Sequence, residues 1–309
     1  SDVIALRARQ FREDNGPLAH PVRPASFVEI NNFYTSTVYE KGAEVIGMLR
    51  RIVGAEAYSR ALDLYFERHD GDAATIEDWL RVFEDATGED LSHFALWYAQ
   101  AGTPRISVSE DYEGDTFRLT LTQHTPPTPG QPEKSPLHVP VAVGLLNPNG
   151  DEVVPTRILT LKEQKQTFEF SGLHARPVAS VLRGFSAPVI LDHDRTAEES
   201  AFLLAHDTDP FNAWEAGRRL AEGVLADMIR DEPDAQRAFL DALDRAIADP
   251  DRDPAFRALL LDLPTEDELA KHLADTGTIP DPDRIHLCHD RLARAISERC
   301  AATLARLYA

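Results

Sequence analysis

The stretch GTPRISVSEDYEGDTFRLTLTQH, residues 102–124, decides the fold, because the hydrophobic pattern changes its period there. Ile106 and Val108 alternate with serines, and Phe117, Leu119 and Leu121 alternate with polar residues. A period of two is typical of a half-buried strand, and the intervening DYEGD is a turn sequence. The stretch therefore predicts a β-hairpin and, with it, the beginning of a β domain.

Strand-like segments continue after the hairpin. Residues 126–140 hold six prolines in fifteen positions, which predicts an extended loop. Further strands are predicted over residues 139–146, 153–159, 166–170, 179–183 and 188–191. Together with the hairpin they make seven short strands, a number and spacing that favour a small antiparallel β-sandwich.

Before the hairpin, residues 38–101 carry apolar residues at helical spacing, together with start and stop signals for four helices. Gly54 is expected to end the first helix and Asp70 to follow the second. Thr75 is expected to cap the third helix through Asp78, and Gly88 to precede the fourth. Three tryptophans on helical stripes are expected to be core anchors: Trp79, Trp97 and Trp214.

From residue 196 the pattern is helical again, in short helices separated by proline-bearing turns, a style that resembles a solenoid. The last helix is predicted over residues 282–308 without a terminal breaker, so we expect the helical array to continue beyond this chain. Cys288 and Cys300 would lie roughly 18 Å apart on that helix. A disulfide needs about 4.4–6.8 Å, so both are expected to be buried, inert thiols.

The formal net charge is −20, from 32 basic and 52 acidic residues, and no dense basic cluster interrupts it. Such a field repels nucleic acid and anionic membrane surfaces, so neither is expected as a partner. No apolar run is long enough for a transmembrane helix, and no signal-peptide pattern is visible. We expect a cytoplasmic protein, and a monomer.

The segment EINNFYTSTVYEKGAEV, residues 29–45, crowds polar and aromatic groups before a helix. Thr37 with Glu40 fits a capping box, which would place Tyr39 in the first helical turn. A phenol near the positive helix end can donate a hydrogen bond to a developing oxyanion. On spacing alone, however, Tyr34 and Tyr39 are better interpreted as packing aromatics.

The same segment resembles the one that follows the zinc-binding helices in gluzincin aminopeptidases of the aminopeptidase N family. Further similar stretches are HPVRP (20–24), YFERHDGDAAT (65–75), LSHFALWYAQAGTP (91–104), EKSPLHVPVAVGL (133–145) and GFSAPVIL (184–191). The resemblance implies that Tyr39 stabilises the tetrahedral intermediate and that Asn31 and Tyr34 line the peptide-binding cleft. It also implies that Glu40 is an acidic neighbour in the active site, where it would contribute to substrate binding.

The resemblance further implies a multidomain α+β chain. Residues 1–102 would be the C-terminal helical part of a thermolysin-like catalytic domain, and residues 103–194 the antiparallel β-sandwich. Residues 195–309 would begin a helical, solenoid-like C-terminal domain. The implied activity is removal of N-terminal residues from peptide substrates by a zinc-dependent parent enzyme.

The zinc-binding signature HExxH is absent from this sequence, although the chain has 11 histidines. We therefore expect no catalytic zinc, and no activity, in this chain by itself. His286 and His289 could share a helix face, but a solvated face is the better interpretation. The alternative function is a non-catalytic scaffold of the same architecture, which the sequence upstream of Ser1 would distinguish. Side-chain specificity is not specified by these residues.

Overall fold

The computed structural model describes residues 2–232 and 235–308, which divide into two units by their internal contacts. The first unit holds residues up to 143 together with 156–174 and 185–193. The second holds residues 144–155, 175–184 and those from 194 onward.

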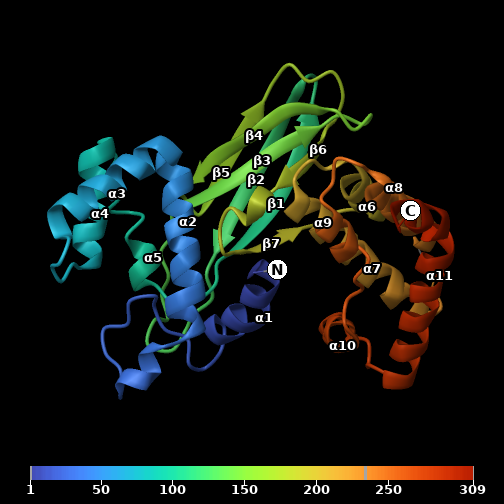
Figure 1. Ribbon diagram of the computed structural model, residues 1–309, viewed down its shortest axis with the longest axis horizontal. Helices are drawn as coiled ribbons and strands as arrows, with labels where there is room; N and C mark the ends of the chain where they lie inside the picture. Colours follow the sequence, from blue (N-terminus) through green and yellow to red (C-terminus); the bar gives the residue numbers. More distant parts are fainter. Residues whose placement is uncertain (1, 233–234, 309) are drawn as a thin grey trace. The chain divides into compact units, whose positions relative to one another are not determined.

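The first unit begins with helices. Their bounds are α1 Asp2–Asp14, a 3₁₀ turn Ile30–Phe33, a π-helical turn Thr37–Lys41, α2 Gly42–Val53, α3 Ala55–His69, α4 Ile76–Thr87 and α5 Leu96–Ala99. Helix α3 lies beside both α2 and α4 (Figure 1).

The predicted start and stop signals of these helices are confirmed at three places. Gly54 follows α2 with a φ of 83°, and Gly88 ends α4 in the left-handed region, where glycine carries no steric cost. Thr75 caps α4 in a full capping box with Asp78. The predicted fourth helix is shorter than expected, because residues 96–98 bond to carbonyls only three residues back.

The strands are present as predicted, and the five after the hairpin end within two residues of the expected positions. Their bounds are β1 Arg105–Glu113, β2 Thr116–His124, β3 Val139–Leu146, β4 Glu152–Leu161, β5 Lys165–Phe170, β6 Val178–Val181 and β7 Ile190–His193. One sheet has the order β5-β2-β1-β7 and the other β4-β3-β6 (Figure 1). The core is formed by the alternating residues of β2 and by β3, which is buried at all eight positions.

The predicted antiparallel sandwich is confirmed, but one edge of it contains a parallel pair. Strand β1 pairs antiparallel with β2, from Arg105 opposite His124 to Glu113 opposite Thr116, but parallel with β7. A tight hairpin can only join antiparallel strands, whereas β7 returns to β1 after a long excursion through the other strands. Hydrophobic alternation alone does not distinguish these two directions.

The second unit carries a helical array. Its helices are α6 Ala197–His206, α7 Pro210–Arg230, α8 Gln236–Ala248, α9 Pro254–Leu259, α10 Glu266–Asp275 and α11 Pro282–Tyr308. Helices α6, α7 and α8 pack on one another, and α11 lies against α7, α8 and α10 (Figure 1). Helix α11 has the predicted bounds, and both of its cysteines, Cys288 and Cys300, are free and buried as expected.

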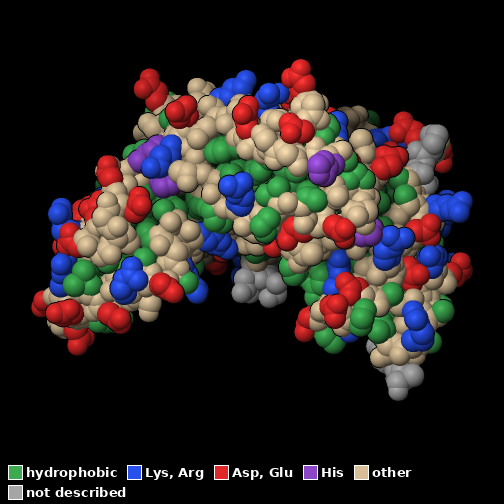
Figure 2. All heavy atoms as spheres, turned by 90° about the horizontal axis from the view of Figure 1, so that it is seen from above, with side chains coloured by type: hydrophobic (Ala, Val, Ile, Leu, Met, Phe, Trp, Pro, Cys, Tyr) green, Lys and Arg blue, Asp and Glu red, His purple; other side chains and the backbone are tan. Residues whose placement is uncertain are grey.

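The surface is rich in charge. Figure 2 shows acidic side chains spread over the visible face, with Lys and Arg side chains interspersed among them. Within the residues that the structure covers, no helix has both the length and the apolar character that a bilayer crossing demands.

Candidate functional site

Tyr39 lies on the π-helical turn Thr37–Lys41 that opens α2. The turn buries Thr37 and Lys41 and leaves Tyr39 57% exposed. Single π-helical turns are rare and occur frequently at functional sites. The placement of Tyr39 in the first turn of the helical segment is therefore confirmed.

The predicted capping box between Thr37 and Glu40 is wrong. The chain is already helical at Ser36, with φ −60° and ψ −32°, so Thr37 lies inside the helical segment and not at its cap. Instead, Glu13 of α1 accepts hydrogen bonds from the Thr37 backbone N–H at 2.8 Å and from the Thr37 hydroxyl at 2.6 Å. The acidic partner comes from 24 residues upstream, which a local motif could not reveal.

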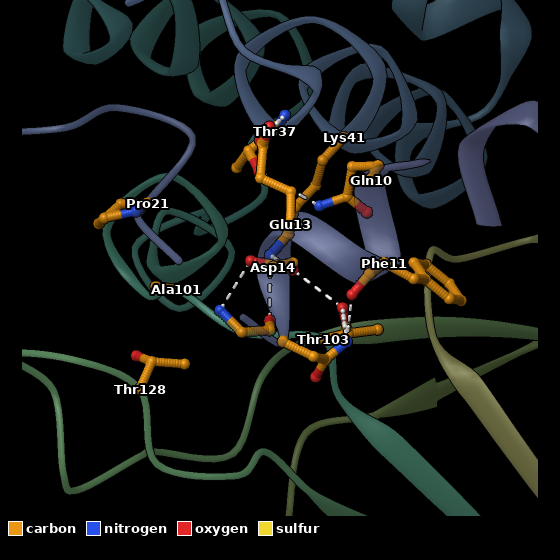
Figure 3. Close-up of polar contacts among 12 residues, drawn as sticks. Gln10, Phe11, Glu13, Asp14, Pro21, Thr37, Lys41, Ala101, Thr103 and Thr128 are labelled. Carbon is orange, nitrogen blue, oxygen red and sulfur yellow. Dashed lines mark hydrogen bonds and ion pairs between the residues drawn. The ribbon is translucent and has the colours of Figure 1, made fainter. Parts of the chain in front are cut away.

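Next to Glu13, Asp14 forms a buried ion pair with Lys41. The Lys41 Nζ lies 2.6 Å from the Asp14 carboxylate, and the two side chains are 1% and 0% exposed. Lys41 also donates to the Gly102 carbonyl at 3.0 Å, while Asp14 accepts from the Gly102 N–H and the Thr103 hydroxyl. Figure 3 shows Glu13 and Asp14 between Thr37 on one side and Thr103 on the other.

Of the four candidate residues, the structure brings Asn31, Tyr34 and Tyr39 into contact with one another along one segment. The rings of Tyr34 and Tyr39 stack with centroids 6.1 Å apart and planes 16° apart. Asn31 lies in the preceding 3₁₀ turn, and its carbonyl accepts a hydrogen bond from the Tyr34 N–H. Glu40 is half-buried, and its Oε2 atom has no hydrogen-bond partner among the described residues. A buried, unsatisfied carboxylate oxygen is costly, which marks Glu40 as a group able to take a further ligand.

A largely apolar cavity of about 810 Å³ lies beside Tyr39. It opens between α2, α3 and α4, and its aromatic lining consists of Phe33, Tyr39, Tyr65, Trp79 and Tyr98. Of these, only Tyr39 was predicted as a site residue. Burial raises the pKa of Tyr98 to about 12, an effect that the Trp79 indole partly opposes. An ion pair between Arg23 and Glu77 also belongs to the wall.

The expectation that all three tryptophans are core anchors is wrong for one of them. Trp97 and Trp214 are buried, but Trp79 is half-buried and lines the cavity. An aromatic on a helical stripe gives the same sequence signal in both cases, because one face of α4 serves both the core and the cavity.

The described residues do not fit a zinc site. No group of three or more His, Cys, Asp or Glu side chains among them could hold a metal ion. His286 pairs with Glu266, with Nδ1 2.8 Å from Oε1, and this hydrogen bond raises the pKa of the imidazole. Two exposed donors are fewer than the three or four protein ligands that zinc uses.

Comparison with known proteins finds three family matches along the chain. Residues 2–98 match the peptidase family M1 domain. Residues 102–194 match a domain of unknown function with an Ig-like fold, and residues 197–309 match a domain of unknown function built of ARM repeats.

Curated relatives match over the whole chain. Aminopeptidase N of Caulobacter vibrioides is 47% identical over 99% of this chain and 36% of its own length. Aminopeptidase N of Escherichia coli is 39% identical over 100% of this chain and 37% of its own length. The chain thus spans somewhat more than a third of these relatives.

A solved structure shares the fold. The crystal structure of Legionella pneumophila aminopeptidase A in complex with aspartic acid superposes with a TM-score of 0.81. The match covers 99% of this chain and 36% of that chain, at 23% sequence identity.

Proposed function

We propose that this chain forms part of an aminopeptidase of the M1 peptidase family, because residues 2–98 match that family's domain and aminopeptidase N proteins are similar to it along its whole length. The proposed reaction is hydrolysis of the N-terminal residue from a peptide. Since the chain spans little more than a third of these relatives, the proposal concerns the whole protein to which it belongs.

The observation that carries the proposal is the position of Tyr39. Its ring is exposed at the start of a helix, on a turn anchored by Glu13 and Asp14, and it lines a largely apolar cavity. Its phenol can donate a hydrogen bond to the oxyanion that develops on the scissile carbonyl. A donor held in place before the reaction stabilises that charge without reorganising.

The neighbouring residues are assigned to substrate binding. Tyr34 stacks on Tyr39 and offers an exposed aromatic face to a peptide side chain. Asn31 precedes it on the same exposed segment and carries both amide donors and an acceptor. The unpaired carboxylate oxygen of Glu40 suits a positively charged or N–H group of the substrate.

Zinc is proposed only for the whole protein. When bound, a zinc ion in such an enzyme polarises the scissile carbonyl. The described residues of this chain do not fit it, so its ligands would come from outside. The steps assigned here involve only the side chains of this chain.

Location and assembly stay predictions. Two buried free thiols suit a reducing compartment, which supports a cytoplasmic location. A monomer remains the expected state of assembly, and the domain boundaries after residues 102 and 194 remain proposals.

Tyr39→Phe in the full-length enzyme tests the proposal. Loss of one oxyanion donor is expected to lower kcat by about 10²–10³ with zinc content and KM unchanged. Tyr112→Phe is the matched control, because its hydroxyl donates to the Leu173 carbonyl in the β region, away from the cavity. Near-normal turnover of Tyr39→Phe would contradict the role assigned to Tyr39, whereas an absence of turnover in the full-length wild type would favour a scaffold.

A further inference from the structure

We infer that Glu13 is a positioning residue for Tyr39, with the Asp14–Lys41 pair as a second anchor of the same turn. This inference rests on the proposed function. Thr37 lies two residues before Tyr39 and Lys41 two residues after it, so the phenol is carried between two fixed points.

The turn itself needs outside support. π-Helical turns are rare and occur mostly as single turns within α-helices. No hydrogen bond within the described part of the chain holds the Tyr39 hydroxyl, although the Tyr39 ring stacks on the ring of Tyr34. The backbone of the turn therefore largely sets where the phenol points.

Glu13 supplies the first support. A single oxygen, Oε1, accepts both the Thr37 N–H and the Thr37 hydroxyl, at 2.8 and 2.6 Å. Bonds to a charged acceptor are short and strong. The partly exposed Glu13 side chain, at 26%, can be substituted with less risk to folding than the fully buried pair beside it.

The Asp14–Lys41 pair supplies the second support. The Lys41 ammonium faces the Asp14 carboxylate, the Gly102 carbonyl and, at 6.0 Å, the centroid of the Trp97 ring. Asp14 is in turn bonded to Gly102 and Thr103. This cluster ties the end of α1 and the beginning of the β region to the turn that carries Tyr39.

Stability alone is a weak reason for such a cluster. A well-packed apolar group in place of a buried ion pair is often neutral or stabilising. Directional bonds, in contrast, fix orientation, and a misplacement of about 1 Å near the reacting atoms can cost about 10² in rate. The location of the cluster, on both sides of the one residue assigned to the oxyanion, fits a positioning role.

The test is a double-mutant cycle in the full-length enzyme with an aminoacyl-arylamide. Glu13→Ala removes the acceptor of Thr37 and is expected to lower kcat by about 10- to 100-fold with little change in KM. Glu13→Gln keeps a carbonyl oxygen and is expected to recover most of the rate. Glu67→Ala, at an exposed position of α3, is the control, and thermal unfolding shows that each variant is folded.

The second arm places Glu13→Ala in a Tyr39→Phe background. If Glu13 acts through Tyr39, its removal there is expected to change kcat by less than about twofold. An undiminished loss in that background, or no loss from Glu13→Ala in the wild type, overturns this inference. If Tyr39→Phe itself leaves kcat unchanged, the oxyanion role proposed for Tyr39 fails instead, so the two failures are distinguishable.

Discussion

The guanidinium of Arg183 lies directly against Gly144, so that a Cβ atom added to the glycine would be 2.3 Å from the Arg183 Cζ. Gly144 belongs to the fully buried strand β3. Arg183 is 3% exposed and bonds there to Ser180 and Asp207 and to the Glu152 carboxylate. Because Gly144 has no side chain, the buried Arg183 guanidinium can occupy the space beside its Cα.

Gly144→Ala is therefore expected to destabilise the protein. Either the arginine moves off its carboxylates or the strand is displaced, and overpacking of this kind costs about 1–3 kcal/mol. Urea denaturation of the variant and the wild type measures this loss as a difference in the free energy of unfolding. Gly223→Ala in α7 is the matched control, since a Cβ there meets nothing within 4 Å, and it should gain about 0.5–1 kcal/mol. Equal effects of the two substitutions would contradict the packing argument.

The buried pair of Lys41 and Asp14 gives a second stability prediction. Lys41→Met leaves a carboxylate that is 0% exposed without its cation, so we expect a loss of about 3–5 kcal/mol in unfolding free energy. Lys41→Met combined with Asp14→Leu should recover most of this loss, because no charge then stays buried. Lys271→Met breaks an exposed pair with Asp275 and should cost less than about 0.5 kcal/mol. A double variant as unstable as Lys41→Met would show that the charge is not the cause.

The strands were predictable because hydrophobic and polar residues alternate along a strand such as β2. The start of helix α4 was predictable because the capping box of Thr75 and Asp78 is a local sequence signal. The parallel partner of β1 was not, since pairing between distant segments leaves no mark on the period. The same limit applies to the site. Tyr34 and Tyr39 are close in sequence, so the sequence alone could place them in one site. Glu13 hydrogen-bonds Thr37 from 24 residues upstream, and no local pattern indicates that contact.

The residues around the cavity show most clearly what sequence patterns cannot predict. The sequence marks Trp79 as apolar and helical, but whether that face meets a neighbour or a cavity depends on how α2, α3 and α4 are arranged. The burial of a charged residue is likewise not indicated by the sequence, because nothing in the residue type distinguishes the buried Lys41 from an exposed lysine. The roles of Asn31, Tyr34, Tyr39 and Glu40 stay predictions until kinetics test them.

His138 predicts a dependence of stability on pH. Burial, helped by the nearby charges of Lys162 and His93, lowers the pKa of this imidazole to about 4, and neither ring nitrogen has a partner among the described residues. The unfolded chain takes up the proton near pH 6.5, but the folded chain takes it up only near pH 4. Stability is therefore unaffected above about pH 6.5 and falls by about 1–3 kcal/mol as the pH drops towards 4.

The check is to compare urea midpoints of the wild type and His138→Leu from pH 7.5 to 4. The variant has no imidazole to protonate in the unfolded state, so its stability should fall less steeply over that range. His174→Leu, at an exposed position, should keep the wild-type slope. Parallel pH profiles for the wild type and His138→Leu would exclude His138 as the source.

The chain by itself is expected to retain far less than one zinc ion per molecule after dialysis, and to hydrolyse no aminoacyl-arylamide. The reason is the donor set: His286 and Glu266 are two exposed ligands where zinc requires three or four. Metal analysis and an activity assay with added zinc measure both expectations. Weak residual binding should disappear in His286→Ala, which would identify it as surface binding. One tightly held zinc ion per chain with zinc-dependent turnover would instead show that this chain holds a complete metal centre, and would refute the proposal that the ligands lie outside it.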